Sequence, residues 1–148
     1  TSATSITANF TLPTDGTYFI RVENNDGNAG RSSSALLTVS DAPTWTTGAG
    51  SLGTIAGNFS GTVATVAATG DSTLAFSETT NVLTNASLAN CTLNSSTGAI
   101  TTSDFGGSST SATTYSFTLR VTDAEGQTAD RNFTLTSSFE IANSGRFD

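Results

Sequence analysis

The chain twice repeats one pattern, in which apolar and polar residues alternate and then enter a short acidic turn. The first copy spans residues 17–23 and turns at 25–27, and the second spans 115–122, turns at 123–126 and alternates again over 132–136. Successive strand residues point to opposite faces, so each run predicts a strand with one buried face, and each turn predicts a hairpin. The copies lie about 100 residues apart, which is the length of one β-sandwich domain.

Turn residues divide the 148 residues into one complete domain and parts of two others. We expect an all-β chain, with a complete Ig-like antiparallel β-sandwich over residues 43–137. The C-terminal part of another Ig-like domain precedes it over 1–40, and residues 40–43 form a Pro-containing linker. Residues 138–148 begin a new pattern, which predicts the start of a following domain or a tail. Strands of the complete sandwich are predicted at 51–57, 61–68, 73–78, 88–93, 98–102, 113–122 and 129–137.

The first domain shows a similar but shorter pattern. Strands are predicted at 6–12, 18–23 and 35–39, with a turn-rich loop at 24–30. Three strands with one apolar face are too few to bury a core. A segment upstream or a neighbouring chain should therefore cover them. Phe19 lies between Tyr18 and Ile20 and faces the opposite side, so we expect it to contact an adjoining domain or subunit.

The apolar positions of the complete sandwich predict its core. The predicted core residues are Trp45, Val63, Val66, Leu74, Phe76, Leu93, Ile100, Tyr115, Phe117, Leu119, Val121, Phe133 and Leu135. The single cysteine, Cys91, is interpreted as a small buried hydrophobe on a strand. The aromatic residues Tyr18, Trp45 and Tyr115 occupy positions typical of a core rather than of a sugar-binding platform.

The residue types that are missing exclude most catalytic chemistry. The chain has no His, its five basic residues are all Arg, and it has one Cys. The usual general bases, amine nucleophiles and Ser-His or Cys-His arrangements therefore cannot form. A His-containing zinc site or a thiolate cluster is excluded in the same way. We expect no enzymatic activity, no catalytic residue and no cofactor, with Ca²⁺ as the one ion to be weighed.

The charge of the chain argues against two classes of partner. The net charge is −7, with acidic groups spread along the chain. Nucleic acids and anionic membrane surfaces are bound by basic patches, so neither is an expected partner. Two charge pairs, Arg120 with Glu125 and Arg131 with Asp130, are expected to lie on the solvated surface, where they contribute little stability.

Three stretches of the chain resemble known families. Residues 4–8, 15–24 and 26–27 resemble the second half of an IPT/TIG-type Ig-like domain. Residues 43–136 are similar to the putative-Ig and cadherin-like repeats of bacterial and phage surface proteins, most specifically in the Leu-Asn-x-x-Thr-Gly-x-Ile element at 93–100. The family's Leu-Pro-x-Gly-Leu segment is replaced here by residues 82–88, which leaves the local turn open. Residues 141–148 are similar to the opening of laminin-G or concanavalin-like lectin domains.

The combined resemblance implies a non-enzymatic structural and adhesive role. It implies a virion-surface protein of a phage, such as a tail fibre, appendage or decoration, in which the chain is a rigid spacer and subunit-contact domain. Its partners would be other virion proteins or copies of itself. Two alternatives stay open. The first is a glycan- or Ca²⁺-dependent host-binding module, with host surface glycans as partners. The second is a spacer in a secreted bacterial adhesin or enzyme, located extracellularly or at the cell surface.

The cadherin-like resemblance also implies a candidate calcium site. Cadherin-type repeats bind Ca²⁺ at domain junctions through acidic motifs, because Ca²⁺ takes six to eight hard oxygen ligands. In this sequence Asp123 and Glu125 occupy the place of the family's Asp-x-Asp loop, and Asp41 lies in the linker. These three residues are the predicted metal ligands. The competing interpretation is a hairpin turn whose acidic groups are solvated. The loop at 24–28 is explained by its turn alone.

Overall fold

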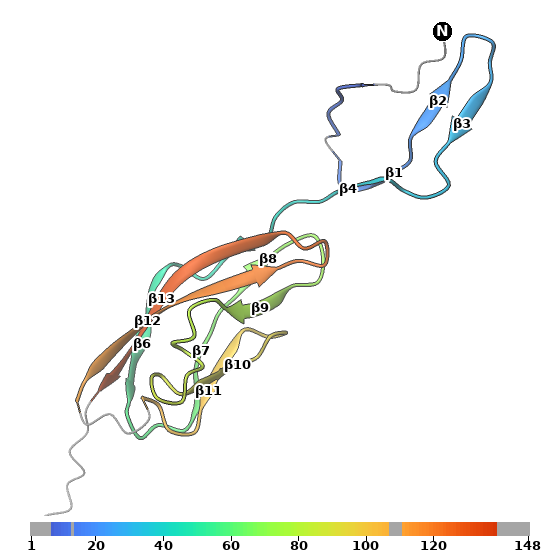
Figure 1. Cartoon of the computed structure of the whole chain (residues 1–148). Coiled ribbons are helices and arrows are strands. Elements are labelled where there is room, and N and C mark those ends of the chain that lie inside the picture. Colours follow the sequence, from blue (N-terminus) through green and yellow to red (C-terminus); the bar gives the residue numbers. More distant parts are fainter. Residues whose placement is uncertain (1–6, 13, 107–110, 139–148) are drawn as a thin grey trace, which may run out of the picture. The chain divides into compact units, whose positions relative to one another are not determined.

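The computed structural model describes residues 7–12, 14–106 and 111–138 (Figure 1). The chain divides into two compact units, Thr1–Asp41 and Ala42–Asp148. All regular secondary structure in the described residues is β-strand, as predicted. None of these residues forms a helix of the length and apolarity needed to cross a membrane. Apart from Ser138, the predicted start of a following domain lies outside the described residues.

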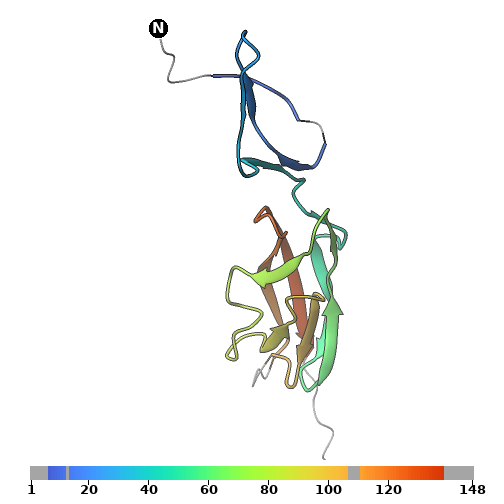
Figure 2. The ribbon, with the colours of Figure 1, turned by 90° about the vertical axis from the view of Figure 1, so that its right-hand side faces the viewer.

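The first unit consists of two short antiparallel strand pairs. They are β1 (Gly16–Tyr18) with β4 (Leu37–Val39), and β2 (Arg21–Glu23) with β3 (Ala29–Arg31). Figures 1 and 2 show β2 and β3 as a hairpin. The predicted turn lies at its tip, where Asn24 N–H donates to the carbonyl of Asn28 at 2.8 Å and Gly27 adopts a φ of +82°. Because few L-residues tolerate this conformation, glycine suits the position.

Two strand predictions for the first unit are wrong. The predicted strand at 18–23 is interrupted at Phe19 and Ile20, because the chain changes its pairing partner there. Ser32 N–H donates to the carbonyl of Ile20 at 2.8 Å, and Ile20 N–H donates to Ser32 Oγ at 3.2 Å. The second wrong prediction is the strand at 6–12. Its described residues, 7–12, belong to no strand. The predicted loop at 24–30 also contains the first two residues of β3.

The second unit is a β-sandwich (Figures 1 and 2). Its larger sheet has the order β6 (Gly50–Ala56), β13 (Thr128–Ser138), β12 (Thr113–Thr122) and β9 (Ala75–Glu78). In this sheet β6 runs parallel to β13, and the other pairs are antiparallel. Its second sheet has the order β10 (Cys91–Leu93), β11 (Ala99–Thr102) and β7 (Gly61–Thr65). A small pair, β5 (Thr44–Trp45) with β8 (Ala68–Thr69), completes the unit.

The long strands of this unit match their predictions closely. β12 has the predicted bounds, and β13 is one residue longer at each end. The predicted strand at 61–68 is divided, because β7 pairs with β11 up to Thr65, whereas Ala68 belongs to β8 and pairs with β5. The predicted strand at 88–93 begins only at Cys91. Residues 85–90 form turns closed by the carbonyl of Asn85, and Asn90 has a φ of +54°.

The core lies between the two sheets and is largely the predicted one. Ten predicted core residues are buried, and Val63, Leu74 and Leu93 are half-buried at its edge. Trp45 anchors it, with ring centroids 5.4 Å from Phe133 and 5.7 Å from Phe76. Cys91 is buried on β10, as interpreted from the sequence. The prediction missed three buried residues on irregular segments, which are Leu83, Ala89 and Phe105.

The Leu-Asn-x-x-Thr-Gly-x-Ile element forms the tight turn between β10 and β11. Asn94 Oδ1 accepts hydrogen bonds from the N–H groups of Ser96 and Thr97 at 2.9 and 3.0 Å. Gly98 has a φ of +68°, and a Cβ on it would collide with the carbonyl oxygen of Val66. The element therefore needs Asn to hold the turn and Gly to let two backbone segments approach.

Candidate functional site

Three carboxylates come together where two loops of the second unit meet. Asp71 lies in the loop at 70–74 between β8 and β9, while Asp123 and Glu125 lie in the hairpin at 123–127 between β12 and β13. One carboxylate oxygen from each residue lies within 4.8 Å of the other two. Asp71 and Glu125 are exposed, and Asp123 is buried with 5% of its surface exposed.

The hairpin fixes the position of Asp123. Asp123 N–H donates to the carbonyl of Gln127 at 3.0 Å, and Gln127 N–H donates back to Asp123 Oδ1 at 2.7 Å. Gly126 N–H donates to the Asp123 carbonyl at 3.2 Å, and Gly126 has a φ of +88°. One carboxylate oxygen of Asp123 is thereby committed to the turn, and its side chain is held in one orientation.

Ser72 joins the two loops. Its hydroxyl donates to Glu125 Oε2 at 2.5 Å and accepts the N–H of Ala124 at 3.1 Å. The loop at 70–74 is therefore tied to the hairpin through hydrogen bonds to a side chain and to the backbone. These bonds keep Glu125 beside Asp71 and Asp123.

The second oxygen of Asp123 lacks a protein partner. Asp123 Oδ2 is buried and has no hydrogen-bond partner among the residues that the structure describes. Leaving a buried acceptor unsatisfied costs about 1–3 kcal/mol, so such atoms usually mark the place of a water or an ion. All donors at the cluster are hard oxygens, with no sulfur or imidazole, and this donor set fits Ca²⁺.

The predicted metal ligands are brought together only in part. Asp123 and Glu125 are neighbours in the site, whereas Asp41 is the last residue of the first unit. The part of Asp41 in a metal site stays a prediction. Asp71 was missed, although the Gly70-Asp71-Ser72 turn between two strands is visible in the sequence. Its approach to the hairpin depends on strand topology, which spacing alone does not give.

A fourth carboxylate, Glu78, does not belong to this cluster and binds backbone N–H groups instead. It accepts the N–H groups of Val82, Leu83 and Thr84 at 2.6, 2.8 and 2.9 Å. The hydroxyls of Thr80 and Thr84 add bonds of 2.8 and 2.9 Å. Burial alone would raise the pKa of Glu78, but these hydrogen bonds together hold it below its usual value. Glu78 thus shapes the segment whose turn the sequence left open.

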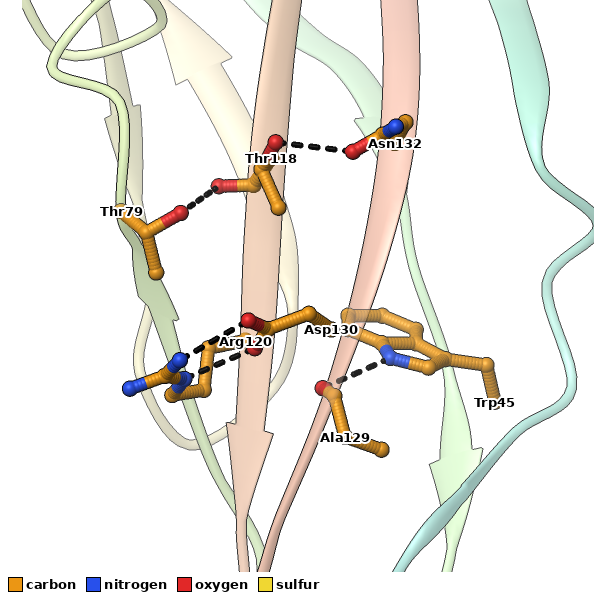
Figure 3. A network of polar contacts seen from close by, with 7 residues as sticks. All are labelled: Trp45, Thr79, Thr118, Arg120, Ala129, Asp130 and Asn132. Carbon is orange, nitrogen blue, oxygen red and sulfur yellow. Dashed lines mark hydrogen bonds and ion pairs between the residues drawn. The ribbon is translucent and has the colours of Figure 1, made fainter.

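The outer face of the larger sheet is polar (Figure 3). Thr118 Oγ1 donates to Asn132 Oδ1 at 2.8 Å, across the β12–β13 ladder. Arg120 forms a two-pronged ion pair with Asp130, with N–O distances of 2.7 and 2.8 Å. On the core side, Trp45 Nε1 donates to the carbonyl of Ala129 at 3.0 Å. The side-chain pairs on this face join neighbouring strands and are exposed to solvent.

Both predicted charge pairs are wrong. Asp130 lies directly opposite Arg120 in the strand register, so Arg120 pairs with it rather than with Glu125. Arg131, the next residue, points to the other side of the sheet. Its guanidinium donates to the carbonyl of Thr47 at 2.6 Å. The alternation of strand side chains, applied to Asp130 and Arg131, could have excluded their pairing.

The first unit carries an apolar surface that no other described part of the unit buries. Its members are large exposed side chains, which are Phe10, Phe19, Ile20, Val22, Leu36 and Leu37. Most of them gather around a hollow of about 580 Å³. The guanidinium of Arg31 lies 3.9 Å from the ring centroid of Phe19 and covers one of its faces. We refer to these six residues as the first unit's apolar surface.

Comparison with solved structures places the fold. The crystal structure of protocadherin gamma B7 extracellular cadherin domains 1–4 superposes with a TM-score of 0.55 and 11% identity, over 87% of this chain and 41% of that one. The solution structure of the third cadherin domain of human protocadherin 7 gives 0.51 and 13%, over 77% of this chain and 100% of that one. The fold is a cadherin-like β-sandwich.

This likeness concerns the fold alone, because the identities are low. The chain spans less than half of the multi-domain neighbours it matches, including 25% of the protocadherin gamma B4 extracellular domain, which superposes with a TM-score of 0.50. No protein-family model matches the chain, and no curated protein matches it. The predicted Ig-like/cadherin-like fold class is confirmed, and the phage context implied by the resemblance stays a prediction.

Proposed function

We propose that this chain is a non-enzymatic structural and adhesive module of an extracellular surface protein. In this proposal the second unit is a rigid spacer and the first unit contacts a neighbouring subunit. The parent protein is a virion-surface protein of a phage, such as a tail fibre, appendage or decoration. The cadherin-like fold supports the modular role, and the resemblance of the sequence to phage and bacterial surface repeats supports the setting.

The observation that carries the proposal is the first unit's apolar surface. Phe10 is 62% exposed, and five of the six side chains of this surface line one hollow. Contiguous apolar surface of this kind marks interaction sites in soluble proteins. The short strands β1 to β4 also leave backbone edges that a partner strand can pair with. The expected partners are copies of this chain or other proteins of the same particle.

The second unit has the properties of a spacer. Its β12–β13 ladder pairs ten residues of each strand without a register break, and the aromatic side chains of its core are buried. The single cysteine of the chain, Cys91, also fits a passive role. Burial raises the pKa of the Cys91 thiol to about 11, so the thiol stays protonated at neutral pH and is a poor nucleophile.

Sedimentation of the full chain tests the contact role. Burying a large apolar side chain contributes about 1.5–3 kcal/mol. Replacing Phe10 and Val22 by Ser should therefore weaken association by about tenfold or more. Leu88→Ser is the matched control, because Leu88 is an exposed apolar residue of the second unit. Circular dichroism checks that all variants keep the β-sheet signal.

Two results would count against this role. In the first, the wild-type chain stays monomeric at high concentration and binds no protein of the source particle. In the second, Leu88→Ser weakens association as much as the double substitution, which would place the contact on the second unit.

A further inference from the structure

We propose that the first unit's apolar surface binds residues 139–148 of a second copy of the chain, so that successive copies associate head to tail. The inference rests on the contact role proposed above and names the partner, which is one segment of another copy. Such an interface joins two different parts of the same sequence, and it builds rings or open filaments.

The first unit's apolar surface selects an apolar and extended partner. Its hollow of about 580 Å³ is lined in part by Val22 of β2. Among the described residues β2 pairs with β3 on one side and with no strand on the other. An extended segment can pair with such an unpaired strand edge while its alternate side chains enter an apolar hollow.

Residues 139–148 have the sequence pattern that this partner needs. Phe139-Glu140-Ile141 alternates apolar and charged residues. When a segment is extended, alternate residues point to the same side, so Phe139 and Ile141 can enter the hollow together. Phe147 adds a third large apolar residue to the same segment.

The rest of the chain matches this surface and this segment less well. The remaining stretches outside the described residues contain one large apolar residue between them, Ile6. Among the described residues of the second unit, Leu88 is the one exposed large apolar side chain, at 38%. The second unit therefore presents no comparable apolar surface in its described part, and the segment fits the first unit best.

The length of the segment favours binding between copies over binding within one copy. The first unit joins the sandwich just before β5, where Trp45 donates to the carbonyl of Ala129 near the start of β13. From Ala129, β13 extends for about 30 Å to Ser138. The ten residues that follow span at most about 36 Å. To reach its own first unit, the segment would use nearly all of this length in running back along β13, and few residues would remain to bind.

The charges of the two partners are complementary. The guanidinium of Arg31 lies 3.9 Å from the ring centroid of Phe19, and among the described residues it forms no ion pair with a carboxylate. The segment carries Glu140 and Asp148, each next to a phenylalanine in the sequence. Binding therefore brings acidic groups close to an exposed guanidinium at the edge of the hollow, which adds a modest, salt-sensitive attraction.

Complementation between two variants of the full chain tests the head-to-tail contact. The surface variant carries Phe10→Ser and Val22→Ser. The segment variant carries Phe139→Ser and Ile141→Ser. In sedimentation velocity, each variant alone should associate more weakly than wild type by about tenfold or more. An equimolar mixture should form a 1:1 complex, because the intact segment of the first variant meets the intact surface of the second.

A labelled peptide of residues 138–148 measures the same contact directly. In fluorescence anisotropy it should bind the segment variant, whose surface is intact, and should not bind the surface variant. Arg31→Gln should weaken the binding of this peptide by about two- to fivefold. The matched control is Asn143→Ser, which changes a polar residue of the segment and should leave association unchanged.

The outcomes separate this inference from the proposed function. If the segment variant associates as wild type does while the surface variant does not, the head-to-tail contact is wrong and the contact role of the first unit stands. If the surface variant also associates as wild type does, both are wrong. The head-to-tail contact is also overturned if both variants are weakened but their mixture forms no complex.

Discussion

Glu78 shows how one side chain can organise an irregular segment. Its carboxylate accepts the N–H groups of three consecutive residues, 82–84, and the hydroxyls of Thr80 and Thr84. These bonds hold the chain so that Leu83 is fully buried in the core. The burial of Leu83 in the core therefore depends on the hydrogen bonds that the Glu78 carboxylate accepts.

This arrangement predicts an acid-dependent loss of stability. Because the hydrogen bonds lower the pKa of Glu78 in the folded state, its contribution is present above the unfolded value near 4.5 and is lost as pH falls through the lower folded value. Glu78→Gln places an amide group against N–H donors and should cost about 1–3 kcal/mol at pH 7. In urea unfolding, the difference between wild type and variant should shrink at about pH 3. An equal difference at both pH values would contradict this account.

At the scale of strands and turns, the tight turn between β10 and β11 is the most constrained element. Gly98 adopts a positive φ and has no room for a Cβ beside the carbonyl of Val66. Gly98→Ala should destabilise the second unit by about 2–4 kcal/mol, which equilibrium denaturation measures. Gly48→Ala is the control, because Gly48 is exposed and a Cβ there meets nothing within 4 Å. Equal stabilities of the two variants would refute the steric argument.

Elements with strict alternation could be predicted from the sequence, and irregular ones could not. β12 and β13 were predictable because less exposed and more exposed residues alternate along them. Residues 7–12 also alternate, yet a strand forms only where a partner ladder exists. Leu83 and Phe105 lie outside regular elements, so their burial depends on tertiary contacts. The same limit applies to the candidate metal site, because Asp71 reaches Asp123 through strand topology rather than through sequence spacing.

At the scale of the whole molecule, the two units differ in how much of their apolar side chains they bury. The second unit buries nearly all of its large apolar residues in one core, whereas the first exposes six of them on four short strands and the segments beside them. The division between the units falls inside the predicted linker at 40–43, and the predicted domain limits themselves stay predictions. The chain thus combines a sandwich that buries its own core with a unit that exposes apolar surface. This combination is expected of a spacer that carries a contact region.

Peptide mass spectrometry of the material from which the protein is isolated tests the proposed virion-surface role most directly. We predict that peptides of this chain are found together with other virion proteins. We also predict that chemical cross-links through carboxylates, such as Asp15 or Glu23, join the first unit to a neighbouring subunit. If the parent polypeptide instead carries a catalytic domain, or is found with cell-envelope proteins and no virion proteins, the virion-surface role is wrong.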